Sequence, residues 1–196
     1  TVPREIMIKH FLDSLVFVNW LEKYYPEKNI LLADLGTGAG FPGIPVKIVI
    51  PEIDLVLIDS LTKRINFLQE GCSVLRLTRV ESFHVRAEDA GRDVGHREKY
   101  DVVVARALAE LPVLLEYAVP LLKTGGRLLA AKGADPEQEL ASAQNALRLL
   151  HCQVEHVEKY YLAEEAAHRS LLIIQKTGPT SSKYPRQAGK PKKSPL

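Results

Sequence analysis

The sequence contains little cysteine and no long apolar run. Cys72 and Cys152 are the only cysteines among 196 residues, and their spacing is not that of metal ligands, so we expect buried free thiols and no disulfide scaffold or metal site. No stretch approaches the roughly 18 uninterrupted apolar residues of a membrane helix, and the start lacks a basic-then-apolar signal pattern. These absences predict a soluble, cytoplasmic protein that does not bind a membrane.

Net charge is also small, but the charge is unevenly placed. The 26 basic and 24 acidic residues give +2. Five basic residues and no acidic one follow Ser182, which leaves 21 basic against 24 acidic residues, or −3, in the rest of the chain. Charge alone favours a solvated, disordered terminus there, and contact with an anion such as nucleic acid is the alternative.

Short apolar runs alternate with segments of helical spacing. We expect strands at 30–35, 55–58, 101–105 and 127–131, and helices at 6–25, 44–50, 62–77, 111–122 and 136–150. Strands that alternate with helices form parallel βαβ units. The apolar segments 154–162 and 170–176 have only a loop between them, which predicts an antiparallel hairpin at a sheet edge. The fold expected is α/β, with helices on both faces of a mostly parallel sheet.

A loop rich in glycine and proline follows the first predicted strand. Its sequence, "DLGTGAGFPGIP" at 34–45, places glycines where the backbone can approach a ligand closely and prolines where they fix the shape of the loop. In an open parallel sheet this loop lies at the carboxyl end of the strands, where ligands bind. We therefore expect it to hold a ligand.

The loop fits two cofactor motifs. Residues 38–43 match the dinucleotide fingerprint, and Asp59 follows about 20 residues later, where a ribose-binding acid belongs. Residues 34–40 match the acidic-led glycine motif of S-adenosylmethionine-dependent methyltransferases. Pro42 and Pro45 lack the N–H groups that a pyrophosphate needs, and Asp34 suits a cofactor with a positively charged amino group. The second register explains more, and an NAD(P)-dependent oxidoreductase remains the alternative.

Seven blocks of sequence make the resemblance to one family specific. They are "KHFLDSL" at 9–15, "DLGTGAGFPGIPVKI" at 34–48, "LIDSLTKRINFL" at 57–68, "RAED" at 86–89, "ARA" at 105–107, "AKG" at 131–133 and "YPRQAGKPKKSPL" at 184–196. In this order they resemble the GidB family, the bacterial small-subunit ribosomal RNA methyltransferases G. The resemblance implies a class I, Rossmann-like methyltransferase that transfers a methyl group from S-adenosylmethionine to N7 of a guanine in small-subunit (16S) rRNA. Its partner would be that rRNA or the 30S subunit, and its product S-adenosylhomocysteine.

The resemblance also divides the chain and marks two departures. We expect an N-terminal helical segment at 1–28, a methyltransferase domain at 29–177 and a basic, proline-rich tail at 178–196. Family members have further helical residues upstream, so a chain that opens on Thr1 is expected to be truncated. Ala105 stands where the family has serine, which removes an expected hydroxyl contact and leaves open a non-catalytic RNA-binding module. We expect a monomer.

Cofactor-binding residues are expected around the glycine loop and the ends of the next strands. By resemblance, Gly36, Gly38 and Phe41 line the methionine and ribose region, and Ala87 and Glu88 flank the adenine. The Asp59 carboxylate has two oxygens that can accept hydrogen bonds from both ribose hydroxyls. The complete predicted set is Asp34, Gly36, Gly38, Gly40, Phe41, Asp59, Ser60, Ala87, Glu88 and Arg106.

Arg106 ends a predicted strand at the same edge, where a guanidinium can bind the cofactor carboxylate or orient the target base. His10, Asp13 and Ser14 share a helix face, which favours either a helix-face hydrogen bond or a metal or general-base pair. Contacts with RNA are expected from Lys132, Arg169, Lys176, Tyr184 and Arg186, with Phe41 or Tyr184 supporting the base.

Guanine N7 carries an exposed lone pair at neutral pH, so its methylation needs no prior deprotonation. We therefore expect no dedicated general base. Catalysis would come from holding the nitrogen, the methyl carbon and the sulfur in line.

Overall fold

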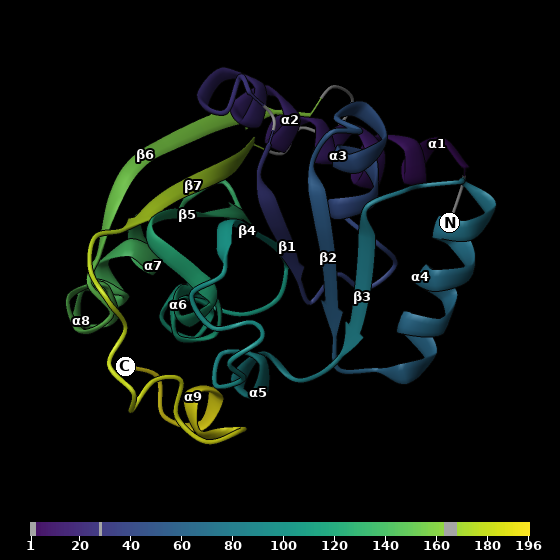
Figure 1. Ribbon diagram of the computed structural model, residues 1–196. Helices are drawn as coiled ribbons and strands as arrows, with labels where there is room; N and C mark the ends of the chain where they lie inside the picture. Colours follow the sequence, from purple (N-terminus) through teal and green to yellow (C-terminus); the bar gives the residue numbers. More distant parts are fainter. Residues whose placement is uncertain (1–2, 28, 163–167) are drawn as a thin grey trace.

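The computed structural model describes residues 3–27, 29–162 and 168–196, and within these residues seven strands form a single sheet (Figure 1). The strand order is β3-β2-β1-β4-β5-β7-β6. Neighbouring strands from β3 to β5 are parallel, whereas β7 is antiparallel to both β5 and β6. The mostly parallel sheet and the antiparallel edge that the sequence predicted are both confirmed.

The first half of the chain contains α1 Pro3–Ile6, the π-helix η1 Met7–Leu12, α2 Asp13–Tyr24, β1 Leu31–Leu35, α3 Gly43–Val49, β2 Asp54–Asp59, α4 Thr62–Val74, β3 Val80–His84 and α5 Ala87–Ala90. The second half contains β4 Tyr100–Arg106, α6 Leu111–Ala118, the 3₁₀ turn η2 Val119–Leu121, β5 Leu122–Lys132, α7 Glu137–Ser142, α8 Gln144–Leu149, β6 Cys152–Tyr161, β7 His168–Lys176 and α9 Lys190–Lys193.

The central strands are buried on both faces, which is why they read as continuous apolar runs. Successive side chains point to opposite faces, so Leu32 and Val104 belong to one hydrophobic cluster and Ala33 and Val103 to the other. Buried residues of α2, α3 and α4 complete the first cluster, and those of α6 and α8 complete the second. The two layers of helices therefore cover opposite faces of the sheet.

Several predicted boundaries need correction. The helix expected at 6–25 starts at Pro3 and includes the π-helical turn, and the helix expected at 136–150 is divided at Ala143. The loop expected between the last two strands falls on residues 163–167, which lie outside the described residues. Cys72 and Cys152 are unbonded and only partly buried.

The expectation of a solvated, disordered tail is wrong. Residues 178–196, which we call the C-terminal strap, run back along the molecule to α5 and α6 and end in the short helix α9 (Figure 1). Tyr184 and Pro191 are buried within the fold. Charge composition failed here because the carboxylates that receive the strap lie far away in sequence.

Candidate functional site

The carboxyl ends of the parallel strands form one edge of the sheet, and cavities bordered by described residues follow that edge. The first, about 540 Å³, lies beyond β1, β2 and β3 and includes Gly36, Asp59 and Glu88 in its wall. The second, about 490 Å³, includes Gly38 and Phe41. The third, about 760 Å³, lies beyond β4 and β5. We call them the acidic, middle and outer cavities.

Shared wall residues show that the three cavities adjoin. Gly36, Arg64 and Ala107 border both the acidic and the middle cavity, and Arg106 and Ala107 border both the middle and the outer cavity. The three cavities are therefore neighbours along this edge, from the acids beyond β2 and β3 to the ends of β4 and β5. This arrangement fits two ligands placed end to end.

The glycine loop owes its shape to Asp34 and to left-handed backbone conformations. Gly36, Gly38 and Gly40 have φ values of 70°, 62° and 95°, which residues with a Cβ rarely adopt. Asp34 Oδ2 accepts hydrogen bonds from the Thr37 hydroxyl at 2.6 Å and from the Gly43 N–H at 2.8 Å. The carboxylate therefore ties both ends of the loop together.

Asp34 and Gly40 support the shape of the loop. Asp34 is fully buried, and burial raises the pKa of its carboxyl to about 6. A Cβ on Gly40 would lie 2.5 Å from the Ile44 side chain, so Gly40 lets the loop pack on α3. The walls of the cavities described above contain neither residue. Both residues thus hold the loop in shape, and their contact with a cofactor stays a prediction.

Asp59, at the end of β2, is already hydrogen-bonded at both oxygens. Its Oδ2 accepts from the Gly38 N–H at 3.0 Å and from Arg64 at 3.1 Å, and its Oδ1 accepts from the Leu61 N–H at 2.9 Å. A carboxylate oxygen can accept about two hydrogen bonds, so Oδ1 has room for one hydroxyl group. A second hydroxyl requires Arg64, which is half exposed on α4, to move away from Oδ2.

The adenine end of the predicted site lies at α5. Ala87 and Glu88 border the acidic cavity, as do Ser60 and Tyr117. Glu88 is buried, and its Oε1 accepts a hydrogen bond from the N–H of Gly189 at 2.8 Å. Burial and the neighbouring Glu88 carboxylate raise the pKa of Tyr117. The wall of the acidic cavity thus contains two carboxylates, those of Asp59 and Glu88.

Arg106 joins β4 to the N-terminal helices. Its guanidinium donates to Asp13 Oδ2 at 3.1 Å, to the Lys9 carbonyl at 3.1 Å and to His10 Nδ1 at 3.0 Å. It also lies over the Phe41 ring, 5.4 Å from the ring centroid. Burial and the Arg106 charge lower the pKa of His10, so at neutral pH its Nδ1 is an acceptor and its Nε2 carries the proton.

The structure resolves the roles left open for the first helix. Ser14 donates to the His10 carbonyl at 2.6 Å, the predicted helix-face hydrogen bond. Asp13 is fully buried and accepts from Arg106, from the Tyr160 hydroxyl at 2.8 Å and from Arg169. Among the described residues, no cluster of histidine, cysteine and acidic side chains could hold a metal ion. His10 is instead part of the wall of the middle cavity.

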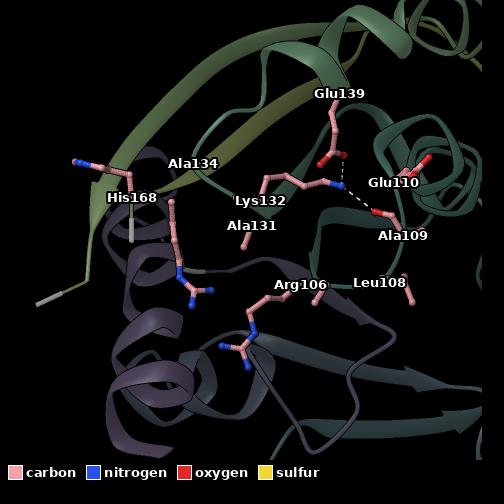
Figure 2. A pocket seen from close by; sticks show the side chains of 12 residues that line it. Arg106, Leu108, Ala109, Glu110, Ala131, Lys132, Ala134, Glu139 and His168 are labelled. Atoms are coloured by element: carbon pink, nitrogen blue, oxygen red, sulfur yellow. Dashed lines mark hydrogen bonds and ion pairs between the residues drawn. The ribbon is translucent and has the colours of Figure 1, made fainter. Parts of the chain in front are cut away.

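Figure 2 shows the outer cavity, with Arg106 on one side and Lys132, Glu139 and Ala109 on the other. The Lys132 ammonium donates to the Ala109 carbonyl at 2.8 Å and to Glu139. Its side chain is only 8% exposed. Lys132 therefore shapes the cavity, and its charge is directed to Glu139 and not outward to a phosphate.

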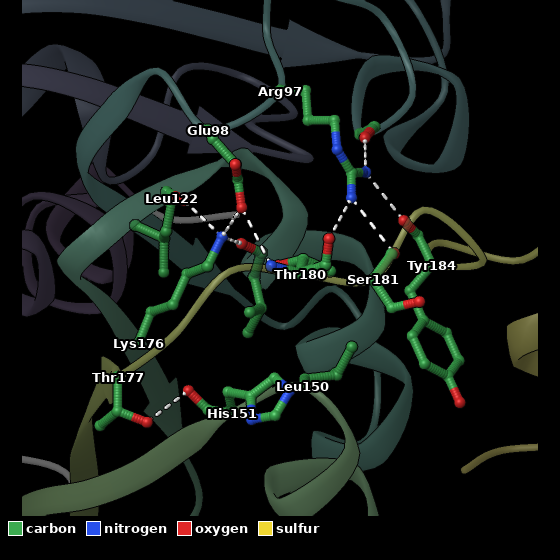
Figure 3. Close-up of polar contacts among 12 residues, drawn as sticks. Arg97, Glu98, Leu122, Leu150, His151, Lys176, Thr177, Thr180, Ser181 and Tyr184 are labelled. Atoms are coloured by element: carbon green, nitrogen blue, oxygen red, sulfur yellow. Dashed lines mark hydrogen bonds and ion pairs between the residues drawn. The ribbon is translucent and has the colours of Figure 1, made fainter.

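Three of the residues expected to contact RNA have partners inside the protein. Lys176 is fully buried and donates to Glu98 and to two backbone carbonyls (Figure 3). Tyr184, within the strap, is buried. Arg186 forms a two-pronged ion pair with the buried carboxylate of Glu116. Arg169 differs, because it borders the outer cavity.

Sequence reasoning missed part of the acidic cavity. Arg64, Gly189, Lys192 and Lys193 border it, although the last three lie more than 100 residues from the glycine loop. Arg64 could have been found from its position one helical turn after Asp59. The strap residues gave no signal beyond the resemblance of their block.

No described helix combines the length and the apolar character needed to cross a membrane.

A family model described as rRNA small subunit methyltransferase G (GidB) matches residues 1–169. The ribosomal RNA small subunit methyltransferase G of Desulfitobacterium hafniense (strain Y51) is 48% identical over 196 residues, 100% of this chain and 80% of that protein. The protein of the same name from Acetivibrio thermocellus is 46% identical over 98% of this chain and 77% of its own length.

Solved structures show the same fold at low identity. M. jannaschii TYW2 in complex with AdoMet has a TM-score of 0.63 at 14% identity, covering 83% of this chain and 76% of its own. The ribosomal protein L11 methylase from Lactobacillus delbrueckii subsp. bulgaricus has a TM-score of 0.61 at 18% identity, covering 82% and 77%. The predicted class I methyltransferase fold is confirmed.

Proposed function

Because the chain belongs to the rRNA small subunit methyltransferase G family, we propose that it transfers a methyl group from S-adenosylmethionine to N7 of a guanine in small-subunit (16S) rRNA. The observation that carries this proposal is the row of three neighbouring cavities from the two acids to Arg106 and beyond it. The substrate is that rRNA or the 30S subunit, and the site of action is the cytoplasm.

The acidic and middle cavities fit an adenosyl cofactor. Asp59 has an acceptor position for a ribose hydroxyl, and Ala87 and Glu88 border the end where the adenine would lie. Pro42 and Pro45 lack N–H groups, and the Gly43 and Ile44 N–H groups already donate to Asp34 Oδ2 and to the Gly40 carbonyl, both at 2.8 Å. The loop therefore offers few free donors to a pyrophosphate. A phosphate-free nucleoside fits these residues better than NAD does.

The middle cavity would take the methionine part. Gly38 and Phe41 border it, and Arg106 and His10 close its far side. Asp13 balances the Arg106 charge at 3.1 Å, which limits the repulsion of a nearby sulfonium cation. We infer that Arg106 is a positioning residue between cofactor and target base, because its side chain borders both the middle and the outer cavity.

When bound, S-adenosylmethionine supplies an electrophilic methyl group. The outer cavity would hold the guanine, bordered by 107–110 and 131–134. N7 needs no general base, so these residues act by alignment: they hold the nitrogen toward the methyl carbon and exclude water. N7 faces the deep, narrow major groove of an RNA helix, so the target base lies in distorted RNA or is splayed out.

Two alternatives are weighed against this proposal. The family match and the N–H groups already used within the loop disfavour an NAD(P)-dependent oxidoreductase. A non-catalytic RNA-binding module would have the same fold, so the fold alone does not separate it from the methyltransferase. Ala105, which replaces the family's serine, is buried in β4, so the serine hydroxyl would have been enclosed at this position.

The test is methyl transfer from radiolabelled S-adenosylmethionine to small subunits that lack the modification, followed by mapping of the labelled base. We expect one labelled guanine, modified at N7. Transfer to another base or ring nitrogen would overturn the assigned reaction. Binding of subunits without any transfer would identify the RNA-binding module instead.

A further inference from the structure

The C-terminal strap is fixed where it leaves β7. Arg97 donates to the carbonyls of Thr180 at 2.8 Å, Ser181 at 3.2 Å and Tyr184 at 2.8 Å (Figure 3). Glu98 accepts from the N–H of Thr180 at 3.0 Å. Two neighbouring residues before β4 therefore hold the first turn of the strap through its backbone.

A second attachment directs the strap toward α5 and α6. Glu116 is fully buried in α6 and accepts from both the backbone N–H and the guanidinium of Arg186, at 2.6 to 3.0 Å. A Cβ on Gly91 would lie 2.8 Å from Pro185 Cγ, so the strap and the end of α5 approach closely. The strap reaches the acidic cavity along a defined path.

The third attachment is made at the cavity itself. Gly189, with a φ of 81°, donates its N–H to Glu88 Oε1 at 2.8 Å. Lys192 and Lys193 follow and border the same cavity as Asp59. Both lysines are exposed and have no carboxylate partner among the described residues, so their charges are available to offset those of the two acids.

We propose that the C-terminal strap is a wall of the cofactor site, in which Gly189 positions Glu88 and the Lys192 and Lys193 side chains cover the adenosyl group. This inference rests on the proposed cofactor, since it names the part of the chain that completes its pocket. The strap contributes by pre-organisation: Glu88 and the cavity wall are ordered before the ligand arrives, which reduces the entropy lost on binding.

The experiment is a calorimetric titration with S-adenosylhomocysteine in the absence of RNA. We expect Gly189→Ala to weaken binding about tenfold, because the Cβ disfavours the left-handed backbone that directs the N–H to Glu88. Gly125→Ala is the matched control. Gly125 has a φ of 87°, and as at Gly189 no described atom lies within 4 Å of the added Cβ. It lies within β5, at the irregularity between the paired residues Leu122 and Arg127, and is not part of the cavity wall.

A second pair of variants tests the lysines without changing the backbone. Lys192→Ala/Lys193→Ala should weaken binding about three- to tenfold through lost cover and charge. Lys183→Ala/Lys190→Ala removes the same charge from strap positions outside the cavity wall and should bind like the wild type.

The outcomes separate the two proposals. Weaker binding by the cavity variants, with wild-type binding by both controls, supports the strap as a wall of the site. Wild-type affinity in the cavity variants, or equal losses in the controls, overturns this inference and leaves the proposed function intact. If the unaltered protein does not bind S-adenosylhomocysteine, the proposed cofactor fails as well.

Discussion

At the scale of single residues, the sequence predicted which side chains carry the chemistry of the site, but not which groups each of them contacts. Asp34 and Asp59 were both expected to touch a ligand, yet Asp34 is enclosed by Thr37 and Gly43 while Asp59 borders a cavity. The difference depends on which way each strand faces and on what packs above it, and spacing along the chain does not contain that. His10 is the converse case, because only the fold brings it to Arg106.

Asp34 should make stability depend on pH. Burial raises the pKa of its carboxyl from 3.8 to about 6, so the folded state binds this proton more tightly than the unfolded state does. Its contribution to stability is therefore greatest below about pH 4 and is lost as pH rises through 6. A shift of about two units corresponds to about 3 kcal/mol.

The measurement is urea denaturation of the wild type and Asp34→Asn at pH values from 4 to 7.5. Groups that titrate in both proteins cancel in the difference. The free energy of unfolding of the wild type, relative to the variant, should fall by about 3 kcal/mol over this range. A difference that does not change with pH would show that Asp34 titrates normally in the folded protein.

At the scale of elements, the apolar strands and the antiparallel edge were predictable because burial on both faces leaves a clear pattern. The end of the chain was not. Residues 178–196 are basic and rich in proline, which indicates disorder, but Arg97, Glu98 and Glu116 bind them through backbone atoms and one arginine. One donor, Arg97, and two acceptors, Glu98 and Glu116, all 70 or more residues away, decide the conformation of this segment.

Arg186→Ala should therefore act on stability. The substitution leaves the Glu116 carboxylate buried with a single backbone donor, and removing one partner of a buried pair costs about 3 to 5 kcal/mol. Denaturant unfolding measures this loss. Arg148→Ala, an exposed arginine on α8, should change the free energy of unfolding by no more than about 0.5 kcal/mol.

The same variant tests the earlier expectation that Arg186 contacts RNA. Its guanidinium is committed to Glu116, so the slope of log binding constant against log salt should equal that of the wild type when only folded protein is counted. A slope smaller in magnitude by about one would show that Arg186 contacts an RNA phosphate.

At the scale of the whole molecule, the order of strands places every predicted cofactor segment at one edge of the sheet. The loop after β1, the end of β2 and the start of α5 meet around the acidic cavity, as expected for a parallel sheet. The sequence could not reveal the outer cavity, because its wall combines the end of β5 with His168 and Arg169 at the start of β7.

Ligand binding should raise the melting temperature of the whole fold. At 100 times its dissociation constant, S-adenosylhomocysteine should add about 2.7 kcal/mol, or roughly 5 to 10 °C. NAD at the same concentration should shift it little. Asp59→Ala should lose most of the S-adenosylhomocysteine shift, whereas Asp54→Ala, at the other end of β2, should keep it. A shift with NAD alone would favour the oxidoreductase.

The position of β7 between β5 and β6 has a consequence for biosynthesis. On a translating ribosome, residues 152–161 emerge before residues 168–176, so β6 leaves the exit tunnel with no strand to pair with. Until β7 has followed, the edge of β5 is open as well, and both segments are exposed to non-native association. The last step of sheet assembly in the nascent protein is thus the insertion of a later strand between two earlier ones.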